Sequence, residues 1–334
     1  MKNLTFFFVF ISLFSCKLTN STNFTLKQKQ YGPIKIEPLK KGDKIAIVAP
    51  AYHCNNDNNL SKSIAWLEKK GFLVTTDYLN KKGEEEDLFS GSDEKRAEKF
   101  QKALDDDQIK AIWSLRGGYG SIRIIDKLDF RKFLKKPKWI IGYSDITIFH
   151  AYLQKHNIPS IHSIMARNLD DYTDSSLISL EKTLFGELPI YNIPSSNKNK
   201  EGKAQGILVG GNLMTLYSAG ESLIDTKDKI LFIEDVEEYL YSIDRILISL
   251  KRNGHLDHIK GLIVGSMTDL KDTNPKFGKS IYDIILKVVS EYSFPVVFDF
   301  PAGHDKNNQT LILGKEIILD AKKEKSTISY VMGK

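Results

Sequence analysis

The sequence predicts two α/β domains, a doubly wound parallel sheet followed by a mixed α/β domain. Short apolar runs alternate with helical patterns between residues 44 and 162, which favours a parallel sheet with helices on both faces. The alternation stops over 166–203, and strand-like and helical runs return from residue 206. A length of 334 residues also agrees with two domains of about 150 residues each.

In the first domain the strand-like runs are short and apolar, and a helical pattern follows most of them. We expect strands at 44–50, 72–76, 109–115, 139–143 and 158–162, and helices at 60–70, 92–104, 121–128 and 145–154. Pro50 ends the first strand, and Gly71 lies where a helix would stop.

In the second domain we expect strands at 206–209, 230–233, 259–264, 296–300 and 311–313, and helices at 239–251 and 279–291. Residues 166–203 contain Pro189, Pro194 and a polar run, so we interpret them as a connector. The boundaries are then a signal peptide at 1–15, a polar tether at 16–40, the first domain at 41–165, the connector, and the second domain at 204–334.

Composition excludes several classes of function. Lysine plus arginine number 48 and aspartate plus glutamate 42, a net charge of +6 with both signs interleaved. This predicts a mildly basic surface without a nucleic-acid-binding stripe. The two cysteines, Cys16 and Cys54, are too few for a disulfide framework or a cysteine-rich metal site.

The N-terminus has the features of an export signal. Residues 4–14 contain nine apolar residues in eleven, after a basic Lys2. A bilayer-spanning helix needs about 20 apolar residues, so the run fits the apolar core of a signal peptide. The sequence Leu-Phe-Ser-Cys at 13–16 resembles a bacterial lipobox, which predicts lipidation of Cys16; an ordinary cleaved signal and an uncleaved anchor are the alternatives. Residues 16–40 would then tether the fold to a membrane.

The first segment with residues suited to catalysis is Ile-Ile-Gly-Tyr-Ser-Asp-Ile-Thr at 140–147. A strand ends, Gly142 and one residue follow, and Ser144 stands where a helix begins. This order is typical of a nucleophile elbow, which lifts the serine hydroxyl clear of the backbone at a helix N-terminus. The usual second glycine is replaced by Ile146, and a simple helix N-cap at Ser144 is the alternative.

The second segment is Arg-Gly-Gly-Tyr-Gly at 116–120, after the third strand. Glycines let a ligand approach the backbone and leave N–H groups free to donate, so this loop fits an oxyanion-binding loop or a plain turn. A dinucleotide-binding loop is disfavoured because the third glycine is missing and no acidic residue ends the next strand. We expect no cofactor.

The third segment is a pair of strand ends in the second domain, where Glu234 and His304 follow apolar runs. An activated serine needs a histidine that takes its proton and a carboxylate that orients that histidine. A turn histidine and a solvated strand-end carboxylate are the alternatives. Asp235, Glu237 and Glu238 crowd Glu234, and we favour Glu234 because the sheet fixes its position.

The remaining candidates carry less weight. We interpret His150 as a packed or capping residue, and Cys54 as a lone thiol without an obvious base. The pair His255 and His258 has ligand-like spacing but no third ligand nearby, so we predict no metal site.

Six segments together resemble the serine LD-carboxypeptidase family, also called muramoyltetrapeptide carboxypeptidases. They are GDKIAIVAPA (42–51), RGGYG (116–120), GYSDIT (142–147), GGNL (210–213), the acidic stretch from IED to IDR (233–245) and PAGH (301–304). They occur in the family's order over residues 40 to 315, and the set is far more specific than any one segment.

The resemblance implies a Ser–His–Glu triad of Ser144, His304 and Glu234. It implies that the backbone N–H groups of Gly117 and Asp145 form the oxyanion hole. It also implies a smaller, swivelling second domain, a site between the domains, and a homodimer. Where many relatives have a Thr-His-Gly-Pro-like segment, this chain has Ile-His-Ser-Ile at 161–164, which leaves the effect on specificity open.

The expected activity is metal-free hydrolysis of the L,D bond before a terminal D-amino acid, most simply D-Ala, of a murein tetrapeptide. Two alternatives remain: a hydrolase of a peptidyl-nucleotide antibiotic, as in some relatives, and a lipid-anchored muropeptide-binding protein without turnover. The N-terminal features predict a lipoprotein held at the membrane in the cell envelope, outside the cytoplasm, with no preference for the inner or outer membrane.

Overall fold

The computed structural model describes residues 34–54, 57–220 and 225–332. The predicted signal peptide, Cys16 and the tether as far as residue 33 lie outside the described residues. Within the described part, no helix combines the length and apolar character that crossing a membrane requires.

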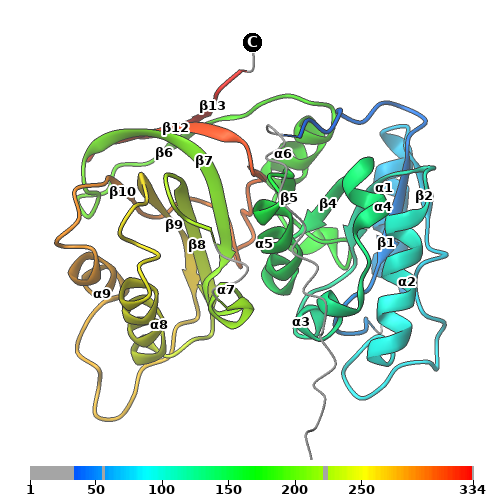
Figure 1. Cartoon of the computed structure of the whole chain (residues 1–334), viewed down its shortest axis with the longest axis horizontal. Coiled ribbons are helices and arrows are strands. Elements are labelled where there is room, and N and C mark those ends of the chain that lie inside the picture. The colour runs from blue at the N-terminus through cyan, green and yellow to red at the C-terminus, as the bar shows by residue number, and fades with distance from the viewer. Residues whose placement is uncertain (1–33, 55–56, 221–224, 333–334) are drawn as a thin grey trace, which may run out of the picture. The chain divides into compact units, whose positions relative to one another are not determined.

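The first sheet has six strands in the order β11-β5-β4-β3-β1-β2 (Figure 1). Its strands are β1 (Lys44–Val48), β2 (Leu73–Thr75), β3 (Ile109–Ser114), β4 (Trp139–Gly142), β5 (Ser160–His162) and β11 (Leu311–Leu313). All neighbours pair in parallel except β11, which is antiparallel to β5. The parallel core confirms the predicted doubly wound α/β domain.

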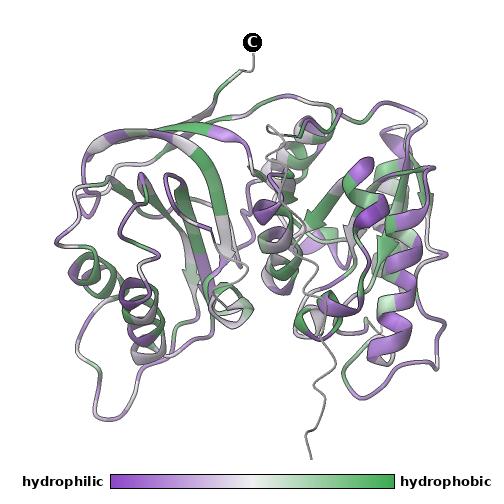
Figure 2. Cartoon of the chain, viewed as in Figure 1, coloured by the Kyte–Doolittle hydropathy of each residue, from purple (hydrophilic) through white to green (hydrophobic). Residues whose placement is uncertain are grey.

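Helices connect the parallel strands. They are α1 (Asp57–Lys69), α2 (Asp93–Asp105), α3 (Ser121–Ile124), α4 (Arg131–Lys135), α5 (Thr147–Lys155) and α6 (Asp174–Leu184), with 3₁₀ turns η1 (Ile125–Lys127), η2 (Ser144–Ile146) and η3 (Leu169–Asp171). Helix α2 is largely hydrophilic and buries Ala97, Phe100, Ala103 and Leu104, while hydrophobic residues concentrate on the strands (Figure 2). Ser92 caps α2 by accepting a hydrogen bond from the Lys95 N–H, which helps fix where that helix begins.

The second sheet has seven strands in the order β10-β9-β8-β7-β12-β13-β6. They are β6 (Ile190–Ile193), β7 (Gly202–Asn212), β8 (Ile230–Val236), β9 (Gly261–Thr268), β10 (Val296–Val297), β12 (Glu316–Ala321) and β13 (Ser326–Tyr330). The block β7 to β10 is parallel and β6, β12 and β13 are antiparallel, which gives the mixed sheet that the sequence predicts. Its helices are α7 (Leu213–Ala219), α8 (Leu240–Arg252) and α9 (Ile281–Val288), and Figure 1 shows α8 and α9 side by side.

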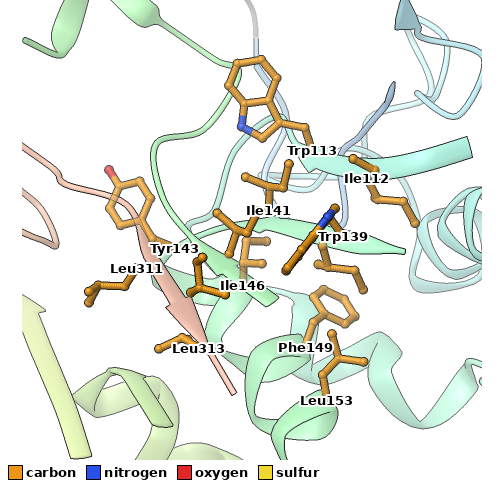
Figure 3. Packing of buried hydrophobic residues seen from close by; sticks show 14 of the residues in the cluster. Ile112, Trp113, Trp139, Ile141, Tyr143, Ile146, Phe149, Leu153, Leu311 and Leu313 are labelled. Atoms are coloured by element: carbon orange, nitrogen blue, oxygen red, sulfur yellow. The ribbon is translucent and has the colours of Figure 1, made fainter. Parts of the chain in front are cut away.

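The core of the first sheet continues to the serine elbow. Figure 3 shows side chains of β3, β4, α5 and β11 packed in one cluster around Ile141. The rings of Phe100 and Phe149 stack with centroids 4.4 Å apart and nearly parallel planes. Trp113 is 1% exposed, and its indole N–H donates to the Ile164 carbonyl at 2.8 Å. This packing holds the end of β4 rigidly.

The last residues of the predicted tether are part of the fold. Ile36 and Leu39 are buried, and the Leu39 N–H donates to the Leu184 carbonyl at 2.8 Å. The indole N–H of Trp139 donates to the Glu37 carbonyl at 3.0 Å. Residues 34–40 therefore belong to the folded domain, because their alternating apolar side chains cover its core.

The predicted connector is also more ordered than expected. Helix α6 lies within it and buries Leu180 and Leu184 in the core of the first sheet, and β6 joins the second sheet. Thr173 caps α6 by accepting from the Ser176 N–H. The serine-rich first turn and the two prolines that follow obscure the helical periodicity of this segment.

The strand at 311–313 departs most from expectation. The sequence assigns it to the second domain, but β11 pairs with β5, with Leu311 opposite His162 and Leu313 opposite Ser160. The chain thus returns to the first sheet before it forms β12. An apolar run of three residues carries no information about which sheet edge it will pair with, since pairing depends on the tertiary structure.

Candidate active site

A strained turn at the end of β4 positions Ser144. Gly142 has φ +157°, and a Cβ there would lie 2.8 Å from the Cγ1 of Ile146. Ser144 itself has φ +61°, a left-handed conformation that is unusual for a residue with a Cβ. The 3₁₀ turn η2 starts at Ser144 and leads into α5. The structure thus places Ser144 on an elbow of the expected kind.

His304 connects Ser144 to Glu234. Its Nε2 lies 3.0 Å from the Ser144 Oγ, and its Nδ1 lies 2.7 Å from the Glu234 Oε2. Glu234 is on β8 and has no exposed surface. The Thr268 hydroxyl donates to the His304 carbonyl at 2.9 Å, and the ring of Tyr143 packs 4.9 Å from the imidazole. Three residues that the sequence places at separate strand ends therefore meet.

Two glycines make room for the Glu234 carboxylate. A Cβ on Gly303, whose φ is +125°, would lie 2.7 Å from the Glu234 Oε2 and closer still to the Ser266 Oγ. A Cβ on Gly265 would lie 3.1 Å from the Glu234 Cβ and would collide with the Ala302 carbonyl. Glycine at both positions allows the chain carrying His304 to lie directly against β8.

The electrostatics of the pair favour a charged histidine. Burial lowers the pKa of His304, but the charge of Glu234 and its hydrogen bond outweigh burial, so the pKa is raised above its ordinary value. The more distant charges of Asp235 and Glu237 act in the same direction. Such an arrangement stabilises the imidazolium that forms when a histidine accepts a proton.

Asp235 connects two backbone segments through hydrogen bonds. Its Oδ1 accepts from the Asn212 side-chain amide and its Oδ2 from the Met214 N–H, both at 2.9 Å, which ties β8 to the start of α7. Burial and then the charge of Glu234 raise the pKa of Asp235 to about 7. Glu237 instead reaches Lys271 at 3.9 Å. Among the crowded acids, Glu234 is the one hydrogen-bonded to His304 in the part of the chain that the structure describes.

The loop at 116–120 lies against Ser144. A Cβ on Gly117 would be 3.4 Å from the Ser144 Oγ and 3.5 Å from the Asp145 nitrogen. The Asp145 carboxylate is buried and accepts from the Ser121 N–H at 2.9 Å, which anchors the end of this loop. Burial raises the pKa of Asp145, while its hydrogen bonds to Ser121 act against that. Gly117 and Asp145, the predicted oxyanion residues, thus border the serine hydroxyl together.

The sequence did not predict that His150 would hydrogen-bond to the backbone of the serine elbow. His150 lies within hydrogen-bonding distance of the Gly142 carbonyl through Nε2, at 2.9 Å, and of the Ser160 Oγ through Nδ1, at 2.8 Å. Burial lowers its pKa to about 4, so a neutral imidazole can donate to the carbonyl and accept from Ser160. This agrees with the interpretation of His150 as a packed residue. The spacing from Ser144 carried no signal for the bond to Gly142.

Tyr143 and Tyr172 form a second element that the sequence did not indicate. Their hydroxyl groups lie 3.2 Å apart, and both rings are largely buried. The fully buried His162, in the segment that departs from the family pattern, faces Tyr143 with ring centroids 5.9 Å apart and Phe232 at 5.0 Å. Burial lowers the pKa of His162 well below its ordinary value. Of these rings, Tyr143 packs against His304, and His162 links Tyr143 to Phe232.

Within the described residues, no group of three or more histidine, cysteine, aspartate and glutamate side chains could hold a metal ion. Cys54 is a half-buried free thiol beside His53 in a pocket of about 290 Å³. The predicted lipidation site Cys16 lies outside the described residues.

Comparison with known proteins agrees with this geometry. Residues 45–163 match the LD-carboxypeptidase N-terminal domain, and residues 205–319 match the LD-carboxypeptidase C-terminal domain. The chain is 30% identical to the probable murein peptide carboxypeptidase of Bacillus subtilis, over 88% of this chain and 94% of that one. It is 27% identical to the microcin C7 self-immunity protein MccF of Escherichia coli, over 87% and 94%.

The crystal structure of muramoyltetrapeptide carboxypeptidase from Oxalobacter formigenes has a TM-score of 0.79 to this chain at 29% identity. It matches over 86% of this chain and 99% of that one. The two domain matches cover most of the chain. The matches to the two carboxypeptidases cover nearly the whole length of those proteins. This chain belongs to the LD-carboxypeptidase family.

Proposed function

We propose that this protein is a serine L,D-carboxypeptidase that releases the terminal D-amino acid, most simply D-Ala, from murein tetrapeptides. The observation that carries the proposal is the hydrogen-bonded series from Ser144 through His304 to Glu234. The names of the relatives from Bacillus subtilis and Oxalobacter formigenes support the substrate class.

In the proposed reaction, the Ser144 hydroxyl attacks the carbonyl carbon of the L,D bond while His304 takes its proton. Glu234 holds the imidazole in the tautomer that this requires and stabilises the imidazolium. The N–H groups of Gly117 and Asp145 stabilise the oxyanion. His304 then returns the proton to the leaving D-amino acid, and water, activated by the same histidine, hydrolyses the acyl-enzyme.

Mass spectrometry of purified murein tetrapeptide after incubation with the full chain tests this proposal. The expected products are the tripeptide and free D-Ala, with the same rate after dialysis against EDTA. A Ser144→Ala variant is the matched control. Unchanged tetrapeptide in the presence of folded wild-type protein would contradict the proposal.

Similarity to MccF supports a second candidate, hydrolysis of a peptidyl-nucleotide antibiotic. The catalytic steps would be the same, so the substrate decides between the candidates. Competing the tetrapeptide against a peptidyl-nucleotide in one reaction gives the ratio of the two kcat/KM values. We expect the tetrapeptide to be preferred, and preference for the nucleotide would favour this second candidate.

A third candidate is a muropeptide-binding protein without turnover. A fluorophosphonate probe separates it from the enzyme, because the probe reacts only with an activated serine. We expect labelling of Ser144 in the wild type and none in Ser144→Ala. Binding of tetrapeptide without labelling or turnover would favour the binding protein.

We also propose that the protein acts in the cell envelope as a lipoprotein anchored through Cys16. The short apolar run and the lipobox-like sequence at 13–16 support this location. Two or more acyl chains give stable attachment where one does not. Fractionation of cells that express the full chain or its Cys16→Ala variant tests this location. We expect the wild type in the membrane fraction and the variant to be released from it. Wild-type protein in the cytosol with Met1 intact would refute the proposal.

The family resemblance further suggests a homodimer. Sedimentation velocity of the full chain in detergent measures the mass directly, and we expect twice the chain mass after correction for bound detergent. A monomer at micromolar concentration would contradict this.

A further inference from the structure

Arg116 lies just past the carboxyl end of β3, immediately before Gly117, which borders Ser144. Its Nη1 donates to the His53 carbonyl at 2.8 Å, and its guanidinium lies 5.5 Å from the centre of the Tyr52 ring. These two contacts hold the half-buried side chain in place. Arginine carries five N–H donors, and the bond to His53 uses one of them.

Arg167 approaches the same place from the loop after β5. The Ala166 N–H donates to the Ser114 carbonyl at 3.0 Å, so the chain at 166–167 lies alongside the end of β3. Arg167 is exposed. Burial raises the pKa values of Tyr143 and Tyr172, and the positive charge of Arg167 acts against that rise in both. Because Arg167 follows the residue bound to Ser114, it lies near the same end of β3 as Arg116.

Neither guanidinium has an acidic partner among the residues that the structure describes. By contrast, Arg96 and Arg123 pair with Asp93, and Arg131 pairs with Asp129. Burial and the charge of Arg167 lower the pKa of Arg116. Two neighbouring cations without a counter-charge repel each other, and an anionic ligand between them would remove that repulsion.

We propose that Arg116 and Arg167 together bind the terminal carboxylate of the substrate, on the first-domain side of Ser144. This inference rests on the proposed carboxypeptidase function and names the group that makes the enzyme act at a chain end. Guanidinium groups bind carboxylates through paired N–H···O bonds with a defined orientation. Gly117 follows Arg116, and a Cβ on Gly117 would lie 3.4 Å from the Ser144 Oγ. A carboxylate held by Arg116 would therefore bring the last peptide bond toward the serine hydroxyl.

The test compares murein tetrapeptide with its C-terminal amide in Arg116→Gln, Arg167→Gln and the double variant, all as full-length protein. We expect kcat/KM for the free acid to fall at least about 30-fold in each single variant, mainly through KM, because an anionic group loses its partner. The amide should be cleaved slowly by every form, with rates within about threefold of each other. Arg116→Lys should recover part of the loss for the free acid.

Arg131→Gln is the matched control, since it removes an exposed arginine of the same domain, and it should leave both substrates unchanged. Thermal unfolding and fluorophosphonate labelling show whether each variant is folded and keeps an activated serine. Equal losses for the acid and the amide in folded, labelled variants would overturn the assignment.

A second readout keeps the inference testable if the wild type cleaves neither peptide, a result that contradicts the proposed function itself. D-Alanine should then slow the fluorophosphonate labelling of wild-type Ser144 more than D-alaninamide does. The double variant should lose this difference. The same difference in wild type and double variant, or no difference in either, would overturn the carboxylate site.

Discussion

The two regions that supply the site are built in different ways. Ser144 depends on a few consecutive residues: β4 ends at Gly142, and the chain turns left-handed within two residues. The proposed acid and base depend on residues far apart in the chain, because Glu234 lies on β8 and His304 reaches it only through contact between separate segments.

The elbow thus depends on local backbone strain, whereas the Glu234–His304 pair depends on how closely distant segments pack. The elbow stores its strain in the φ of Ser144, and the core beneath it holds that conformation. The acid–base side has little room: glycines at 265 and 303 are needed so that two segments can pack together. Changes at the elbow should therefore act on chemistry alone, whereas changes around Glu234 should act on both geometry and stability.

The largest expected effect is at the elbow. Ser144→Ala should lower kcat for tetrapeptide hydrolysis by about 10⁵–10⁶, since an activated nucleophile is lost. The half-buried hydroxyl contributes little packing, so the free energy of unfolding should change by no more than about 0.5 kcal/mol. Stopped assays of D-Ala release and denaturant unfolding measure the two. More than a tenth of wild-type turnover would exclude Ser144 as the nucleophile.

The next effect is on the acid. Glu234→Gln should lower kcat by about 10⁴, because the amide neither stabilises the imidazolium nor fixes the tautomer. Glu237→Gln is the matched control and should stay within about threefold of wild type, since Glu237 instead reaches Lys271. Steady-state kinetics of both variants decide between them. An active Glu234→Gln beside an inactive Glu237→Gln would show that the wrong carboxylate was chosen.

A smaller effect is expected from the packing around the acid. Gly303→Ala puts a Cβ against Ser266 and Glu234, so kcat should fall by about 10² through misplacement of His304, with a loss of about 1–3 kcal/mol in stability. Gly278→Ala controls for backbone strain, because Gly278 also has a positive φ, +76°, but no atom within 4 Å of its Cβ position. Similar losses of activity in both variants would show that strain, and not the contact with Glu234, is responsible.

The smallest effect is a shift in pH dependence. The pKa of His304 is raised above 6.5, so its protonated form stabilises the fold below that pH, and this contribution is lost as the pH rises through the folded pKa. Activity has the opposite sign, because the base must be neutral, and the acidic limb of kcat/KM should lie above pH 6.5. In Glu234→Gln burial dominates, and the limb should move to lower pH. The pH dependence of the labelling rate measures both forms, and an unshifted limb would contradict the coupling.

The parts of the site that were predictable from sequence are those with a local pattern. A strand, a glycine and a serine before a helix indicate an elbow, and Glu234 and His304 follow apolar runs in the second domain. The alternating elements also predicted the parallel sheet. The left-handed φ of Ser144 and the bond from His150 to Gly142 have no such pattern, since both depend on packing from several elements.

The parts that were not predictable depend on tertiary contacts. Residues 34–40 look like a continuation of the polar segment until Ile36 and Leu39 are seen against the core. Helix α6 has serines in its first turns and is followed by Pro189 and Pro194. For β11 the partner strand is about 150 residues earlier in the chain, and no short-range rule connects the two.

The return of β11 to the first sheet has a consequence for how the protein is made. Strand β5 would be the edge of that sheet without β11, and β11 follows β6 to β10 and α7 to α9 of the second domain in the chain. The segment that carries His304 runs into this strand, which pairs with β5 through residues 311–313. In chain order, Ser144 thus precedes its proposed base by 160 residues. The proposed triad is complete only near the end of chain synthesis, and we expect chains that stop before residue 304 to lack activity.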